Sequence, residues 1–272
     1  EGLERHVAEQ HRAEVRQKWA LGYAFITRDN VESPTELTES STWIVERYRG
    51  SPAIMFFAIL YHAGKFRANH DFEDLRSFLG SSVLALACSS FHQHPTFVAL
   101  QAFASLGSRH IARDSALEPL RAAWAATDRS WHTVDICLHA LAVAPPFDGQ
   151  AQLLRDYALE AAEEFPQQHL VHFRLATGQR LAGEHAAALN SVDTALRLLP
   201  AVGNRTRHEL FQEQFLRERA LITNAQHIAE ITERYEHRLA EQEAGNEEVR
   251  RSLASHTVRV VEVVTLVMAA IT

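Results

Sequence analysis

The strongest constraint on the fold of this chain is a recurrence of residue types at a spacing of 34 positions. Five matched pairs carry it: Leu141 and Leu175, Ala142 and Ala176, Gly149 and Gly183, Ala161 and Ala195, and Pro166 and Pro200. Small residues let two helices approach closely, glycine permits the left-handed turn that ends a helix, and proline stops a helix. A recurrence of this length is typical of stacked helical hairpins.

The rest of the sequence also favours helices. The 272 residues include only 11 glycines and 8 prolines, which is too few for an all-β chain with many tight turns. Short breaks separate predicted helices over residues 70–90, 95–106, 111–127 and 129–144. Short links join neighbouring helices into antiparallel hairpins, so we expect an all-α fold built as an α-solenoid and followed by a long C-terminal helix.

Residues 169–200 resemble a tetratricopeptide (TPR) repeat. The family pattern appears here as Leu175, Ala176, Gly183, Ala188, Val192, Ala195 and Pro200. Residues 135–166 resemble it more loosely, because Leu154 stands where the family has alanine and Pro145-Pro146 shortens the first helix. The resemblance covers residues 135–200 only, and it implies a right-handed stack of helix pairs whose concave face holds a peptide or a partner protein.

The resemblance also implies which side chains line that concave groove. The matching first-helix positions are Ile136, His139, Val143, Leu170, Phe173, Thr177, Arg180 and Leu181. This set is more apolar than a groove that clamps an acidic peptide terminus. Two occupants therefore remain open, namely the chain's own N-terminal helices or an apolar helix of a partner.

A long helix is predicted over residues 205–257, because no strong helix breaker occurs between Arg205 and Gly245. Two series at heptad spacing run along it: Leu221, Ile228, Tyr235, Gln242, Val249 and His256, and Ala225, Thr232, Leu239, Asn246, Leu253 and Val260. Such spacing is typical of a coiled coil, so we assign self-association to Leu221, Ile228, Tyr235, Leu239, Val249 and Leu253. The alternative is an amphipathic helix that caps the repeats within the same chain.

Residues 258–272 form an apolar segment without a charge after Glu262. Three interpretations are open: the start of a transmembrane helix, an apolar helix packed in a bundle, or a valine-rich strand. Arg250, Arg251 and Arg259 precede the segment. If it enters a membrane, this positive cluster places the preceding region on the cytoplasmic side.

Charge and motifs exclude several classes of function. The net charge is −7 and no basic run exceeds a pair, so we expect no nucleic-acid partner. The two cysteines, Cys88 and Cys137, do not make a disulfide framework and favour a reducing compartment. Cys88 with His92 and His94 comes nearest to a metal site, but a buried thiol beside helix-end histidines explains it better. We therefore predict no catalytic residue, no metal and no cofactor.

These observations divide the chain into N-terminal hairpins (1–130), TPR-like repeats (131–204), a long helix or coiled coil (205–257) and the apolar segment (258–272). We expect a non-catalytic protein–protein interaction scaffold, the cytoplasmic sensing or docking region of a bacterial membrane-anchored signalling or defence protein. It would bind a protein or peptide and form a homo-oligomer through its C-terminal helix. The alternatives are a soluble TPR peptide-binding regulator with that helix folded back, and a metal-dependent enzyme.

Overall fold

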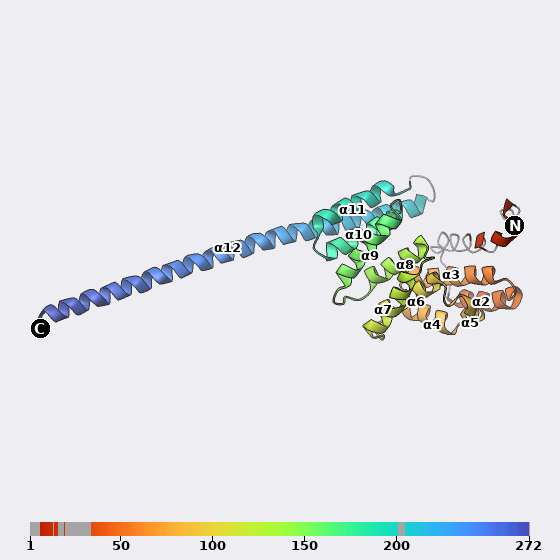
Figure 1. Ribbon diagram of the computed structural model, residues 1–272, viewed down its shortest axis with the longest axis horizontal. Coiled ribbons are helices and arrows are strands. Elements are labelled where there is room, and N and C mark those ends of the chain that lie inside the picture. Colours follow the sequence, from red (N-terminus) through yellow and green to blue (C-terminus); the bar gives the residue numbers. More distant parts are fainter. Residues whose placement is uncertain (1–5, 13, 16–18, 20–33, 201–204, 272) are drawn as a thin grey trace. The chain divides into compact units, whose positions relative to one another are not determined.

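The computed structural model describes residues 6–12, 14–15, 19, 34–200 and 205–271 (Figure 1). Within these ranges all regular structure is helical, which confirms the predicted all-α class. Contacts divide the chain into two units, a helical body of residues 1–218 and a C-terminal segment of residues 219–272. The predicted boundary at residue 205 therefore differs from the observed one, because the first turns of the last helix belong to the body.

The first half of the body contains the helices α2 (Pro34–Tyr48), α3 (Pro52–Asn69), α4 (Phe72–Ser81) and α5 (Val83–Ala87). Proline stands at the first position of α2 and α3, where its missing N–H costs nothing. The single helix predicted over residues 70–90 is wrong. It breaks at Ser82, whose backbone is extended and whose hydroxyl accepts a hydrogen bond from the Ala85 N–H. Serine competes with helical hydrogen bonds in this way, and a 3-10 turn, η3 (Ser89–Phe91), comes after α5.

The centre of the body is formed by α6 (Pro95–Gly107), which contacts α4, α7 (Arg113–Ala125) and α8 (Trp131–Val143). Phe97 and Phe103 on α6 and Leu138 on α8 are fully buried. They belong to one apolar core that runs from Val45 to Leu175. This core fixes α3, α8 and the next hairpin against one another, and these elements carry the candidate site.

The two glycines of the 34-residue recurrence lie before α9 (Gln150–Glu164) and between α10 (His169–Leu181) and α11 (His185–Leu198). Gly149 and Gly183 have φ values of 80° and 82°, the left-handed conformation that favours glycine. Gly183 ends α10, since its N–H donates to Arg180 O and the Glu184 N–H donates to Gln179 O. Gly149 instead opens α9, because α8 has already ended at Val143 before the two prolines. Membership of the tetratricopeptide family stays a prediction.

The last helix, α12 (Arg205–Ile271), is continuous over its 67 residues. It joins the two regions predicted at 205–257 and 258–272 into one element, so the strand interpretation of the apolar segment is wrong for residues 258–271. Among the described residues, no helix combines the length and the apolar character needed to cross a bilayer.

Candidate functional site

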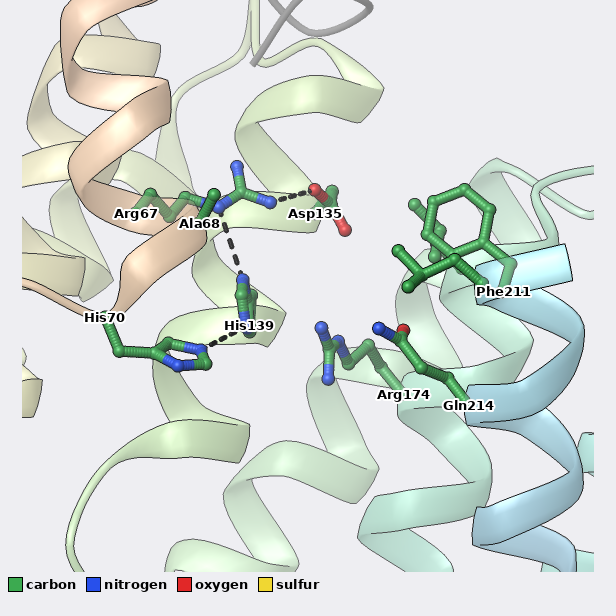
Figure 2. Close-up of a pocket in the computed structure, with 10 residues that line it drawn as sticks. Arg67, Ala68, His70, Asp135, His139, Arg174, Phe211 and Gln214 are labelled. Carbon is green, nitrogen blue, oxygen red and sulfur yellow. Dashed lines mark hydrogen bonds and ion pairs between the residues drawn. The ribbon is translucent and has the colours of Figure 1, made fainter. Parts of the chain in front are cut away.

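Four helices of the body surround a cavity of about 170 Å³ (Figure 2). Its side chains come in pairs one helical turn apart, so that each pair shares a helix face. The lining residues are Arg67, Ala68 and His70 at the end of α3, Asp135 and His139 on α8, Leu170 and Arg174 on α10, and Leu210, Phe211 and Gln214 on α12. The first turns of α12 thus complete a wall of this pocket, which we call the polar pocket.

An ion pair at one end of the polar pocket joins α3 to α8. The Arg67 Nη2 donates to the Asp135 carboxylate at 2.6 Å, and both side chains are almost fully buried, at 4% and 2% exposed. A buried charge is tolerated only with a partner and hydrogen bonds, and this pair meets that condition. The Arg67 Nε donates to the Nδ1 of His139 at 3.2 Å, which makes that ring nitrogen an acceptor.

The two histidines extend this chain of contacts. With Nδ1 of His139 accepting from Arg67, the proton of its neutral ring sits on Nε2, which lies 3.4 Å from Nε2 of His70. Burial of part of the His70 ring, together with the positive charges of Arg174 and Arg67, lowers the pKa of His70 below its ordinary value. Acceptance of a hydrogen bond at Nδ1 requires a neutral His139 ring, and the lowered pKa favours the neutral form of His70.

His70 reaches the polar pocket through an unusual backbone conformation. It caps the end of α3 with φ 58° and ψ 33°, and it is the only described residue other than glycine with a positive φ. This left-handed region costs a side chain with a Cβ about 1 kcal/mol or more. This unfavourable conformation brings the imidazole of His70 into contact with His139 and with the rings of Phe72 and Phe103.

The opposite wall is apolar and carries a second cation. Leu170, Leu210 and Phe211 face the cavity, and the guanidinium of Arg174 points into the space between His139 and Gln214 (Figure 2). With neutral histidines, the lining has two arginines and one aspartate, a formal charge of +1. Among the described residues that line it there is no hydroxyl, thiol or amine side chain, and its one carboxylate is engaged by Arg67. The arrangement suits binding of an anionic group.

The predicted groove residues have different positions in the structure. Only His139 and Leu170 line the polar pocket, whereas Ile136, Phe173 and Thr177 are buried, Val143 is half-buried and Leu181 is exposed. The first turns of α12 cover this face. The ring of Phe215 stacks on Phe173 at 4.7 Å, and Arg180 donates to the Glu218 carboxylate at 2.7 Å. The segment on this face is therefore the start of α12, and not the N-terminal helices or a partner helix that the sequence left open. The alternative of an amphipathic helix that caps the repeats within the same chain predicts this position for the first turns of α12.

The predicted self-association residues lie on the exposed part of α12. Leu221, Ile228, Tyr235, Leu239, Val249 and Leu253 are 45% to 64% exposed.

Cys88, His92 and His94, the residues that come nearest to a metal site in the sequence, have other surroundings in the structure. The Nδ1 of His94 accepts from the Thr96 N–H, and the Nε2 of His92 lies 3.0 Å from Ala85 O. Burial raises the pKa of Cys88 to about 11. In the described parts of the chain, no group of three or more possible ligands could hold a metal ion.

Sequence reasoning missed Arg67, His70, Asp135, Arg174 and the three α12 residues of the polar pocket. One signal was available, since Asp135 is the only charge in the apolar stretch Val134–Leu138 and a buried carboxylate requires a cation. The sequence does not indicate that the cation is Arg67, because Arg67 lies 68 positions away from Asp135.

In comparisons with protein-family models, curated proteins and solved structures, no match to this chain was found.

Proposed function

We propose that this protein is a non-catalytic protein–protein interaction scaffold that holds a partner by one acidic side chain in the polar pocket. The observation that carries this proposal is the composition of the lining, with two arginines, two neutral histidines and an apolar wall around a single engaged carboxylate. An arginine fork binds a carboxylate with charge-assisted hydrogen bonds.

The size of the polar pocket favours a side chain over a free cofactor. Sites for drug-sized molecules measure roughly 300–1,000 Å³, and this cavity is only about 170 Å³. One water molecule occupies about 30 Å³ of liquid, so the space corresponds to about six waters. That volume suits a glutamate or aspartate side chain, whose peptide would run along the rim.

The apolar wall specifies the neighbours of that acidic residue. Leu210 is 48% exposed, and it shares the wall with Leu170 and Phe211. Apolar side chains beside the acid would bury this surface at roughly 25 cal/mol per Å². We therefore expect the partner to present an acidic residue flanked by leucine or an aromatic residue.

The proposal is tested by calorimetric titration of the full chain with a blocked pentapeptide that carries one glutamate between a leucine and a phenylalanine. The same peptide with glutamine, and free propionate, are the comparison ligands. We expect the glutamate peptide to bind at least about tenfold more tightly than the glutamine peptide, and Arg174→Gln to remove that difference. Arg197→Gln, on an exposed arginine of α11, is the matched control.

Two results would contradict the proposal. Equal affinity for the glutamate and glutamine peptides would mean that the pocket does not recognise the charge. Propionate binding as tightly as the glutamate peptide would indicate a site for a free small acid, which is not the site of an interaction scaffold.

A second observation supports the membrane-proximal location expected from the sequence. Val258, Val261 and Val264 are 56% to 58% exposed and, at 100° per residue, share one face of α12 about 120° wide. An exposed apolar helix face beside basic residues suits the surface of a membrane. We propose that this end of α12 contacts lipid beside Arg250, Arg251 and Arg259. Co-sedimentation with phosphatidylglycerol vesicles, abolished by Val261→Asp, is the expected result, and no sedimentation of the unaltered chain would refute it.

A further inference from the structure

We propose that residues 225–263 of α12 pair with the same residues of a second copy of this chain, as a parallel, in-register, two-stranded coiled coil. In a heptad register with Ala225 at position a, the a positions are Ala225, Thr232, Leu239, Asn246, Leu253 and Val260. The d positions are Ile228, Tyr235, Gln242, Val249, His256 and Val263. The pairing does not depend on the polar pocket, since none of these residues lines it.

The exposed apolar series needs a cover. Ile228, Tyr235, Leu239, Val249 and Leu253 are 58% to 64% exposed. Most of the stability of a helix in water comes from burying such a face, because an isolated helix is marginal. The heptad spacing restricts the cover to another helix with the same repeat, and a second α12 has it by definition.

The ion pairs along α12 lie away from this seam. Arg234 pairs with Glu230, His237 with Glu241, and Arg251 with Glu247, each four residues apart. In the register with Ala225 at position a, all six residues occupy the outward positions b, c and f. The charged face is therefore satisfied within one helix, and the a and d face is left for the partner.

The charges beside the seam favour the parallel arrangement. Arg238 stands at a g position and Glu243 at the e position five residues later, and neither makes an ion pair in the described part of α12. In a parallel pair, each g residue faces the e residue five positions later on the partner, so two Arg238–Glu243 contacts form. No like charges meet at the other g and e positions.

The polar layer points the same way. Parallel pairing sets Asn246 against Asn246, the device by which a single asparagine at an a position fixes register and strand number. The antiparallel alignment that matches Asn246 with Gln242 gains two Glu236–Arg250 contacts, but it sets Glu243 against Glu243 near the centre. Parallel pairing has the same number of attractive contacts and no repulsive one.

Sedimentation equilibrium of the full chain tests the partner. We expect a mass twice the 30.6 kDa of one chain. Leu239→Asp should give the monomer, because a charge at an a position cannot be solvated in the seam. Ala244→Asp, the same charge at an outward f position, should leave the dimer intact. A monomer at every concentration, a larger assembly, or a dimer that resists Leu239→Asp would overturn the proposal.

Two further variants test the orientation. Thr232→Cys should form an interchain disulfide under mild oxidation, and Ala240→Cys, one residue outward, should not; both native thiols are buried. Arg238→Glu should weaken the dimer about tenfold or more, and Arg238→Glu with Glu243→Arg should restore it. In the antiparallel arrangement Thr232 would lie far from Thr232 and Arg238→Glu would have no effect, and either result would refute the parallel pair.

Discussion

Breaking the Arg67–Asp135 pair gives the sharpest test of how the polar pocket is held. Asp135→Asn keeps the size of the side chain and removes its charge, which leaves the guanidinium of Arg67, 3% exposed, without its counter-charge. Removing one partner of a buried pair costs about 3–5 kcal/mol. Domains have about 5–15 kcal/mol of total stability, so this variant should be close to the limit of folding.

Replacing both partners should cost far less than replacing one. In Arg67→Met with Asp135→Leu, no charge is buried, and the two apolar side chains fill the space between α3 and α8. Such replacements are often neutral or stabilising by about 1–4 kcal/mol. Glu209→Gln is the control, because its pair with Arg205 is exposed and spaced i, i+4, where a contact contributes about 0.3–0.5 kcal/mol.

Urea unfolding followed by tryptophan fluorescence measures these effects on the helical body alone, since all four tryptophans lie before residue 219. We expect the midpoint to fall strongly for Asp135→Asn and to return towards the starting value in the double variant. A loss below about 1 kcal/mol for Asp135→Asn would mean that the pair is solvated. A double variant as unstable as the sum of the single variants would mean that the two residues are not coupled.

Three other predictions concern single positions. A Cβ on Gly178 would lie 2.7 Å from the backbone nitrogen of Arg155, so Gly178→Ala should destabilise the body by about 1–3 kcal/mol in spite of its better helix propensity. Gly80→Ala, with open space around it, should not be destabilising in the same urea titration. Burial lowers the pKa of both His70 and His94. Below pH 6.5 these histidines are therefore protonated more readily in the unfolded chain than in the folded chain. The free energy of unfolding should be constant above pH 6.5 and should decrease below it. A melting temperature that rises on acidification would contradict this prediction. His70→Gly should remove the backbone strain of the left-handed conformation and raise the free energy of unfolding by about 0.5–1 kcal/mol. The same variant should weaken the binding of the glutamate peptide. A loss of stability would show that the backbone is not strained.

The sequence was sufficient to predict several helix starts and the turns at two glycines. Pro52 and Pro95 mark the starts of helices, and the glycines of the recurrence adopt the left-handed turn that their spacing indicates. It failed at Ser82, where an apolar pattern on both sides concealed a break made by one side-chain hydrogen bond. The physical reason is that capping by a single hydroxyl competes with hydrophobic periodicity, and periodicity alone does not reveal which of them prevails.

The polar pocket was beyond sequence reasoning for a different reason. Its walls come from segments between residues 67 and 214, and the decisive pairs are made by tertiary packing rather than by spacing. Of the eight groove positions implied by the resemblance to helical repeats, only His139 and Leu170 line the polar pocket. The resemblance did not indicate that α12 would cover Phe173 and Arg180, since the repeat pattern does not specify the packing of the helix after the last repeat.

The participation of α12 in the pocket has a consequence during synthesis. A nascent chain that has emerged only as far as α11 has the cations of Arg67 and Arg174 but none of the wall formed by Leu210, Phe211 and Gln214. The polar pocket is therefore complete only when translation has passed residue 214, and a proteolytic fragment that ends before α12 would keep most of its core yet lack the finished pocket.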